Sequence, residues 1–360
     1  MSTSTSDKNT RPAGRRFLAV FSAAALCGLL LSSVIVAVID PFFIYHDPLP
    51  SFPYVVDNQL SQNIGMAEHF EYDSVITGSS MTMNFNTGDL TELMGLSPLK
   101  LTMNGAYPRD IKRILDASFS GKNTLKAAFI AIDPSTWTAD EAETKYPYPE
   151  YLYDRDPFND VKYLWNMDVL LHYCIRPMAE REPTDLRTVY STDWEDDMYY
   201  TLDWILDHYD KPEPADEETP EDAYAEGTLR DLNINLLGSI REHPETEFFF
   251  FFPPYSVLYW HNAEVEGHLD ATIAQERLIA QTLLAEPNAR VFMFQDLADI
   301  VTALDGGYMD EIHFRPWVNR YMCECFADGA CEVADVNDMD ARLANTRSII
   351  ENFDFEEILK

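Results

Sequence analysis

The sequence predicts an α/β protein with a five-stranded parallel sheet, preceded by one transmembrane helix. Three observations indicate this: short apolar runs alternate with helical patterns, one uncharged stretch lies near the N-terminus, and small or polar residues directly follow each apolar run. Apolar strands separated by helices are typical of a parallel sheet that is buried on both faces. Functional side chains of such sheets gather beyond the carboxyl ends of the strands.

The N-terminal part of the chain predicts a membrane anchor. Residues 17–39 contain no charged side chain and are long enough to cross a hydrocarbon core of about 30 Å as a helix. Residues 1–16 carry positive charge, which predicts a cytoplasmic tail. A cleaved signal peptide has a shorter apolar core followed by small residues, whereas Asp40 and Pro41 follow here. We therefore expect a single-pass protein of the cell membrane, with its N-terminus cytoplasmic and its folded domain extracytoplasmic.

Composition and charge restrict the partners of the exported part. The chain has 360 residues, of which 46% are hydrophobic, enough for one large domain or two ordinary ones. Its formal net charge of −35 argues against nucleic acid, whose binding needs basic patches. The same charge disfavours docking on anionic lipid and indicates a well-solvated surface.

The cysteines predict a disulfide and no metal. Cys27 lies in the expected membrane span, and the other four cysteines form an even number in an oxidising space. Cys325 and Cys331 bracket an expected helix end, which favours a bridge between them; a bridge from Cys323 to Cys331 and free thiols are the alternatives. The spacing is not that of a CxxC pair and no histidine stands at ligand spacing, so we predict neither a metal site nor a cofactor.

The expected elements follow in order along the chain. A connector rich in proline and aromatic residues covers residues 40–69 and ends in a helix over residues 58–69. The sheet domain is expected over residues 70–335, with strands at 73–77, 99–103, 125–132, 247–252 and 289–294. Further helices are expected over residues 108–119 and 268–285, from Pro316 onward, and over 336–360 as one C-terminal helix.

An insertion over residues 138–235 interrupts this alternation and is too long for one crossover connection. Residues 159–173 predict a helix, and its stripe of apolar residues at helical spacing is expected to be core. Residues 212–222 are acidic and rich in proline, so we expect disorder there.

The most informative motif follows the first expected strand. Gly78, Ser79 and Ser80 end that strand, a setting that presents a serine at the edge of a sheet. A serine nucleophile needs a histidine base and an acid that orients it. Asp310 and His313 follow the last strand, and their spacing lets the carboxylate reach the imidazole Nδ1. The alternative is a turn of small residues with no chemistry, in which Ser79 caps the turn.

These motifs resemble the SGNH/GDSL hydrolases: G-x-S follows the first strand, a glycine follows the second, and DxxH follows the last. The resemblance covers about residues 70–330 and is strongest to the membrane-anchored cell-envelope branch, with its DltD-like and alginate O-acetylation proteins. It implies a three-layer, flavodoxin-like SGNH fold. It also implies Ser80 as the nucleophile, His313 as the base, Asp310 as the orienting acid, and the N–H groups of Ser80 and Gly105 as oxyanion donors.

One position departs from the pattern of this family. An asparagine after the third strand would supply a third oxyanion donor, but Asp133 stands there. An anionic Asp133 would oppose an oxyanion, which makes Asn104, beside Gly105, the candidate substitute. Tyr255 follows the fourth strand and is either structural or faces the substrate.

Two functions of different class follow from these observations. The first is an extracytoplasmic esterase or O-acyltransferase that acts on acyl esters of a cell-envelope glycan or other acylated polymer. The resemblance implies a membrane-bound O-acyltransferase as a partner of such a protein. The alternative is a catalytically silent member of the same fold that binds an envelope polymer or a membrane partner. The Ser80, Asp310 and His313 set favours the first, and the missing asparagine favours the second.

Overall fold

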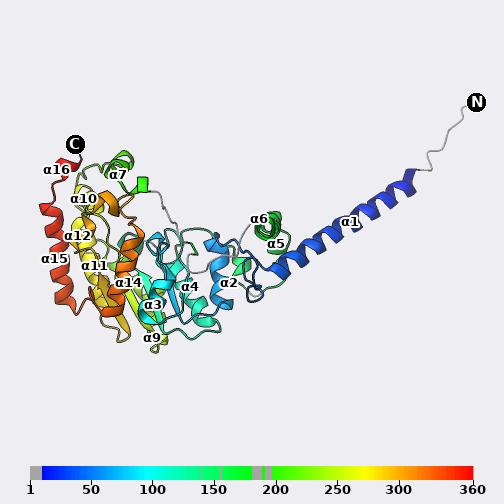
Figure 1. The fold of residues 1–360 in the computed structure, drawn as a ribbon, viewed down its shortest axis with the longest axis horizontal. Helices are drawn as coiled ribbons and strands as arrows, with labels where there is room; N and C mark the ends of the chain where they lie inside the picture. The colour runs from blue at the N-terminus through cyan, green and yellow to red at the C-terminus, as the bar shows by residue number, and fades with distance from the viewer. Residues whose placement is uncertain (1–9, 139, 155, 181–188, 191–196, 360) are drawn as a thin grey trace, which may run out of the picture. The chain divides into compact units, whose positions relative to one another are not determined.

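The computed structural model describes residues 10–138, 140–154, 156–180, 189–190 and 197–359. The chain divides into two compact units (Figure 1). The first comprises Met1–Val55 and Pro149–Thr184, and we call it the anchor unit. The second comprises Val56–Tyr148 and Asp185–Lys360, and we call it the sheet domain. The expected insertion is therefore shared between the two units.

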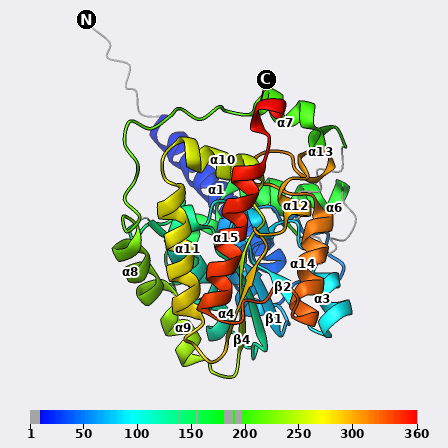
Figure 2. The ribbon, with the colours of Figure 1, turned by 90° about the vertical axis from the view of Figure 1, so that its left-hand side faces the viewer.

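Five parallel strands form the centre of the sheet domain, as predicted (Figure 2). They are β1 (Ser74–Thr77), β2 (Pro98–Lys100), β3 (Ala127–Ala131), β4 (Glu247–Phe252) and β5 (Ala289–Met293), in the spatial order β2-β1-β3-β4-β5. This 2-1-3-4-5 order reverses direction between β1 and β3, and in doubly wound sheets ligands bind at such a reversal. Because all strands are parallel, their carboxyl ends meet at one edge, as expected from the sequence.

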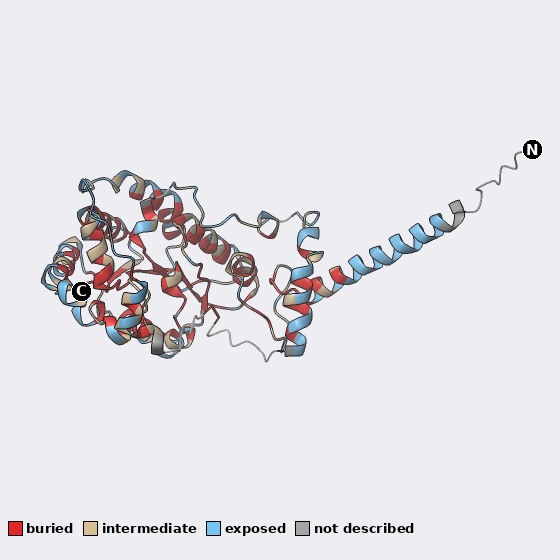
Figure 3. Ribbon diagram, turned by 90° about the horizontal axis from the view of Figure 1, so that it is seen from above, coloured by how far each residue is buried: buried red, intermediate tan, exposed pale blue. Residues whose placement is uncertain are grey.

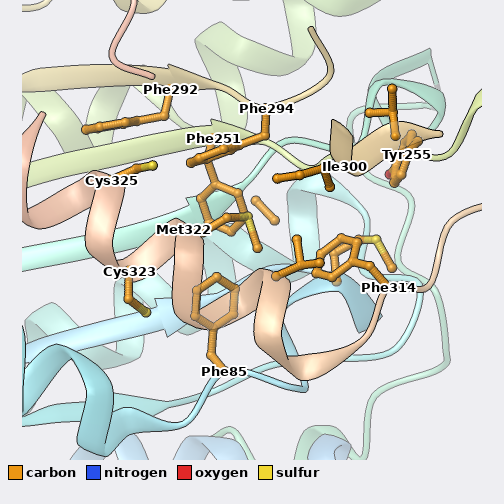
Figure 4. Packing of buried hydrophobic residues seen from close by; sticks show 14 of the residues in the cluster. Phe85, Phe251, Tyr255, Phe292, Phe294, Ile300, Phe314, Met322, Cys323 and Cys325 are labelled. Atoms are coloured by element: carbon orange, nitrogen blue, oxygen red, sulfur yellow. The ribbon is translucent and has the colours of Figure 1, made fainter. Parts of the chain in front are cut away.

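Phenylalanines on β4 explain how the sheet is buried on both faces. Successive side chains of a strand point to opposite faces. Phe249 and Phe251 therefore share one face, where both contact Phe326 at ring distances of 6.1 and 5.4 Å. Phe248 points to the other face and contacts Phe119 at 6.1 Å. Rings of β5 and Phe85 extend the cluster around Phe251 (Figure 4).

Helices cover both faces of the sheet. One face carries α3 (Thr87–Met94) and α14 (Pro316–Asp328), which contact each other and contribute Leu90 and Phe326 to the main core. The other side carries α4 (Pro108–Ser120), α8 (Ala225–Asn235), α9 (Leu237–Glu242) and α11 (Leu269–Leu283) (Figure 2). The helix α2 (Gln59–His69) packs on α4, and α10 (Val257–Val265) and α15 (Val336–Asn352) pack on α11. Shorter helices are η2 (Pro134–Thr138), η6 (Asp197–Tyr200), α7 (Leu202–His208), α12 (Ala298–Val301) and α13 (Leu304–Gly307).

Helix boundaries agree with the sequence signals in most places. The helices expected near residues 58–69, 108–119 and 268–285 are present, and Pro316 is the first residue of α14. The expected C-terminal helix over 336–360 is wrong as one element, because the chain is extended at Phe353. A second helix, α16 (Phe355–Ile358), begins there because the side chain of Asp354 accepts the N–H of Glu357.

The acidic segment at residues 212–222 is ordered, contrary to the expectation of disorder. The N–H of Ala215 donates to the carbonyl of Val265 at 3.1 Å, and the N–H of Thr219 donates to that of Gly267 at 2.7 Å. Backbone hydrogen bonds to the end of α10 therefore hold a segment whose side chains alone would not fold it.

The anchor unit contains the N-terminal helix α1 (Thr10–Ile39), of which Gly14–Ile39 is long and apolar enough to cross a membrane. Asp40 ends the helix with a φ of +48°, and its carboxylate accepts the N–H groups of Ile44, Tyr45 and His46 at 2.6–3.1 Å. A compact turn therefore follows the apolar helix directly.

The predicted helix over residues 159–173 is wrong as a continuous element. It consists of α5 (Val161–Leu164), a break, a π-helix over Val169–Ile175, and α6 (Arg176–Glu180). The break occurs because the side chain of Asn166 accepts the N–H of Asp168 at 2.9 Å, which caps a new helical segment. The expected apolar core stripe is also wrong, since Val161, Trp165 and Leu171 are exposed.

Candidate active site

Ser80 lies directly beyond the carboxyl end of β1. Gly78 has a φ of +145°, and a Cβ at this position would lie 2.8 Å from the Cβ of Ala131. Glycine is therefore required for the ends of β1 and β3 to approach each other. Ser80 begins the short helix η1 (Ser80–Thr82), and the side chain of Ser79 accepts the N–H of Met81 at 3.2 Å. The structure thus gives Ser79 the capping geometry that the alternative reading of this turn assigned to it.

Buried side chains of β2 and of the chain after it stabilise the Ser79–Ser80 turn by hydrogen bonds. The hydroxyls of Thr82 and Thr102 each donate to the carbonyl of Ser79 at 2.8 Å. Lys100 is fully buried at the end of β2, and its ammonium donates to the carbonyls of Met83 and Phe85. Lys100 was not predicted as part of the site, although a lysine inside an apolar strand is the signal that identifies it.

His313 is held on a loop between β5 and α14. Tyr308 and Phe314 form an antiparallel bridge that closes this loop, and both side chains belong to the main core. The hydroxyl of Tyr308 donates to the carbonyl of Pro254 at 2.6 Å. The N–H and the hydroxyl of Ser256 both donate to the carbonyl of Glu311, at 3.0 and 2.8 Å. The loop is therefore fastened to the end of β4.

The structure brings Ser80, His313 and Asp310 together in one chain of hydrogen bonds. The Oγ of Ser80 lies 2.9 Å from Nε2 of His313, and Nδ1 of His313 lies 2.6 Å from a carboxylate oxygen of Asp310. The other oxygen of Asp310 accepts the N–H groups of Ile312 and His313 at 2.9 and 2.7 Å. Because the carboxylate accepts from Nδ1–H, Nε2 carries the lone pair that can accept the proton of the Ser80 hydroxyl.

The electrostatics of Asp310 favour its charged form. Burial raises the pKa of this carboxyl, but its hydrogen bonds to the side chain and backbone of His313 and to Ile312 outweigh burial, so the pKa lies below its usual range. The side chain of His313 retains 23% of its exposure, so the imidazole is accessible from solvent. A charged, oriented acid behind an accessible imidazole is the arrangement that general-base catalysis requires.

Gly105 and Asn104 lie on the neighbouring strand end. The N–H of Met103 donates to the carbonyl of Gly78 at 3.0 Å, so the chain after β2 runs beside the chain after β1. Gly105 adopts a φ of +64° in the turn that follows. The side chain of Lys145, which was not predicted, covers Gly105, since a Cβ there would lie 2.9 Å from its Cε. The side chain of Asn104 is exposed, and its backbone N–H donates to Gln59 at 2.9 Å.

Asp133 occupies the position after β3 and is buried. Its carboxyl accepts a hydrogen bond from the hydroxyl of Tyr255, which is also buried, and interacts with the hydroxyl of Ser79. Burial raises the pKa of Asp133 above its usual range, against the opposing effects of these two hydroxyls and of His313. Tyr255 is therefore a buried partner of Asp133, and both lie behind the Ser79–Ser80 turn.

A second buried carboxyl lies deeper in the same domain. Tyr255 contacts Tyr259 at a ring distance of 4.5 Å, and the charge of Glu276 acts on both tyrosines. One carboxyl oxygen of Glu276 accepts a hydrogen bond from Gln295 at 2.9 Å, and burial raises the pKa of Glu276 to about 8. Glu276 was not predicted, although it stands on the apolar face of an expected helix.

The cysteines near the end of α14 lie outside this chain of hydrogen bonds. The predicted disulfide is not formed: the thiol of Cys325 donates a hydrogen bond to Sγ of Cys331 at 3.5 Å, and both are free cysteines, as is the buried Cys323. Within the part of the chain that the structure describes, His, Cys, Asp and Glu side chains do not form a group of three that could hold a metal ion.

Comparison with known protein families gives no match, and neither does comparison with curated protein sequences. The chemistry of the site therefore depends on the geometry of the residues described above.

Proposed function

We propose that the protein is an extracytoplasmic serine esterase or O-acyltransferase of the SGNH type, acting on acyl esters of a cell-envelope glycan or polymer. The observation that carries this proposal is the chain of hydrogen bonds from Asp310 through His313 to Ser80. The strand order 2-1-3-4-5, with helices on both faces of the sheet, supports a flavodoxin-like SGNH fold.

In the first half of the reaction, Nε2 of His313 takes the proton of the Ser80 hydroxyl while Oγ attacks the acyl carbonyl carbon. The carbonyl electron pair moves to oxygen, which becomes an oxyanion. When the tetrahedral intermediate collapses, the bond to the alcohol breaks and the alcohol oxygen takes the proton from His313. The products of this half are the free alcohol and an acyl ester on Ser80.

In the second half, His313 takes a proton from an acceptor hydroxyl, whose oxygen attacks the acyl group on Ser80. The bond to Ser80 breaks, and Oγ recovers the proton from His313. A water acceptor gives hydrolysis, and a sugar hydroxyl gives acyl transfer. Asp310 stays ionised throughout and stabilises the imidazolium that forms in each half.

The oxyanion is stabilised by the N–H groups of Ser80 and Gly105, which belong to the adjacent ends of β1 and β2. Asp133 takes no direct part, because its carboxyl is engaged by Tyr255 and Ser79. Burial raises the pKa of Asp133 and so disfavours a negative charge beside the oxyanion, and the carboxyl positions the Ser79–Ser80 turn instead. Asn104 remains the candidate for a third donor.

The anchor helix supports a location at the cell envelope. Positive charge before the uncharged residues 17–39, at Arg11, Arg15 and Arg16, favours an extracytoplasmic sheet domain. A membrane-bound O-acyltransferase is the partner that the resemblance to the cell-envelope SGNH proteins implies.

A fluorophosphonate probe tests the nucleophile directly, since it reacts with activated serines. We expect labelling of the parent chain and loss of labelling in Ser80→Ala. Ser97→Ala is the matched control, because Ser97 is exposed before the opposite end of β2 and should label like the parent. Equal labelling of Ser80→Ala and the parent would remove Ser80 as nucleophile.

The alternative, a silent binding protein, is favoured by Asp133 at the place of the asparagine. It predicts no labelling of the folded parent chain and retention of an envelope polymer by the parent and by Ser80→Ala alike. A chromogenic acetyl ester, assayed with and without a soluble glycan acceptor, separates hydrolysis from transfer by the acyl content of the glycan.

A further inference from the structure

The segment that follows residue 156 in the anchor unit has two unlike sides. Its inner side is buried: Tyr163, Val169, Leu170, Tyr173 and Cys174 are enclosed. Phe42, just after α1, contacts the rings of Tyr163 and Tyr173 at 5.2 and 5.0 Å. The hydroxyl of Tyr163 donates to the carboxylate of Asp40 at 3.0 Å and accepts the N–H of Phe42 at 3.0 Å. The segment is therefore packed firmly against the end of α1.

Its outer side consists of large apolar residues that are exposed. Phe158 is 87% exposed and Met178 is 64% exposed. Exposed apolar surface on a folded domain commonly marks a contact with a partner or a membrane. We call the following six residues the apolar face: Phe158, Trp165, Met167, Leu171, Ile175 and Met178. Figure 3 shows exposed residues along most of α1 and on the outer side of the helices that pack at its end.

Two hydrogen bonds fix the depth of the apolar face along α1. The indole N–H of Trp165 donates to the hydroxyl of Ser33 at 2.8 Å, and the hydroxyl of Ser32 donates to the carbonyl of Leu164 at 3.3 Å. Ser33 lies six residues before Ile39, which is about 9 Å along a helix axis.

The length of α1 then sets the position of Trp165 in a bilayer. The uncharged stretch of α1, residues 17–39, has 23 residues and begins directly after Arg15 and Arg16. That is about 35 Å of helix, roughly one turn more than a hydrocarbon core of about 30 Å. The last turn of the helix therefore lies among the headgroups, and Trp165 lies near their boundary with the hydrocarbon. Tryptophan is enriched at this boundary because its ring is apolar and its N–H is polar.

We propose that the apolar face is a second membrane-contacting surface, which lies in the headgroup and acyl boundary of the leaflet at the C-terminal end of α1. The occupant is lipid, because the apolar face continues the exposed apolar surface of α1. Lys162 and Asp168 are exposed within the same segment, so it lies in the interface rather than crossing the bilayer. The contact is apolar and does not depend on anionic lipid, which the acidic chain disfavours.

This inference rests on α1 as a membrane anchor, but not on catalysis. It implies that the protein is held at the membrane by a helix and by a side surface, which together restrict how the anchor unit can tilt. A lone helix would leave the unit free to rotate about it.

Quenching of tryptophan fluorescence by brominated lipid tests the proposal with a matched control. Trp165 and Trp317 are each 45% exposed, and Trp317 belongs to the sheet domain. The full chain is reconstituted in vesicles of phosphatidylcholine, or of phosphatidylcholine with bromines on the acyl chains, and flotation first confirms that it is bound. We expect the brominated lipid to quench the parent, Trp165→Phe to lose more than half of that quenching, and Trp317→Phe to retain it.

The other outcomes contradict the proposal in distinguishable ways. If the chain does not float with the vesicles, both the anchor and the apolar face are wrong, whatever the activity of the site. If it floats and Trp165→Phe is quenched as strongly as the parent, the apolar face does not touch lipid. If the Trp165 contribution to quenching appears only when protein is diluted tenfold in lipid, a second copy of the chain covers the face, and lipid is not its normal occupant. Fluorophosphonate labelling of the same samples reports separately on the proposed enzyme.

Discussion

The sheet domain buries its large apolar side chains, whereas the anchor unit leaves several of them exposed. In the sheet domain, the phenylalanines of β4 are fully buried and the carboxyls of Asp133 and Glu276 are enclosed with them. In the anchor unit, Phe158, Leu171 and Met178 are exposed. Under the proposal that the apolar face contacts lipid, the difference has a simple cause. Water drives apolar side chains inward in the sheet domain, and lipid accepts them on the outside of the anchor unit.

The largest effect is expected from variants of Ser80 and His313 in the sheet domain. Ser80→Ala, His313→Ala and the double variant should each lower kcat/KM for an acetyl ester by on the order of 10³-fold or more, and the losses should not add. The reason is that nucleophile and base act as one unit. Steady-state kinetics on the three variants measures this. Multiplying losses in the double variant would show that the two residues act independently and would contradict the proposed triad.

Removing a buried apolar side chain should destabilise the protein far more than removing an exposed one. Phe326→Ala removes a ring that four phenylalanines on three strands contact, together with Phe294 just after β5. It should cost about 3–5 kcal/mol of unfolding free energy. Met178→Ala in the apolar face should cost less than about 0.5 kcal/mol.

Urea unfolding of the detergent-solubilised chain, followed by near-ultraviolet circular dichroism, measures both variants. Equal costs would mean that the apolar face is packed as a core, and the contrast between the two units would disappear.

Glu276 should make the stability of the sheet domain depend on pH. Its pKa is raised to about 8 in the folded protein, from 4.5 in an unfolded chain. Folding therefore binds a proton between these values, and this contribution to stability is lost as pH rises from 4.5 through 8. Glu276→Gln removes that dependence and should stabilise the protein by on the order of 3 kcal/mol at pH 7.

Thermal unfolding at pH 5 and pH 7.5 checks this prediction, with Glu351→Gln as the control, since Glu351 is exposed on α15. Parallel curves for Glu276→Gln and the parent would show that Glu276 is ionised in the folded state.

The smallest expected effect concerns Asp133. If this carboxyl is neutral, Asp133→Asn preserves both its shape and its hydrogen bonds to Tyr255 and Ser79, so kcat/KM should change by less than about fivefold. Asp133→Ala leaves the hydroxyls of Tyr255 and Ser79 without this partner. It should lower kcat/KM on the order of tenfold further than Asp133→Asn does. Ester kinetics compares the two. A large loss in Asp133→Asn alone would indicate that the charge of Asp133 is needed.

Much of the sheet domain could be predicted because its strands are continuous apolar runs followed by small residues. Strand ends of a parallel sheet share one edge, so Ser80 and His313 were expected to meet, and the structure places them 2.9 Å apart. Lys100, Lys145 and Glu276 were missed because each is a polar residue whose partners come from other elements, and a single sequence does not show which. The apolar stripe near Trp165 was assigned to a core because helical spacing reveals an apolar face but not what lies against it.

The distance in sequence between Ser80 and His313 has a consequence for the order of folding. The two residues are 233 positions apart, and the loop that carries His313 is fastened to the end of β4 and closed by core residues. A chain that is synthesised from its N-terminus completes the serine turn long before the base exists. Any product that stops before β5 therefore has the serine turn but lacks His313. On the proposed mechanism, such a product has no activated nucleophile, and reactivity appears only when nearly all of the protein has folded.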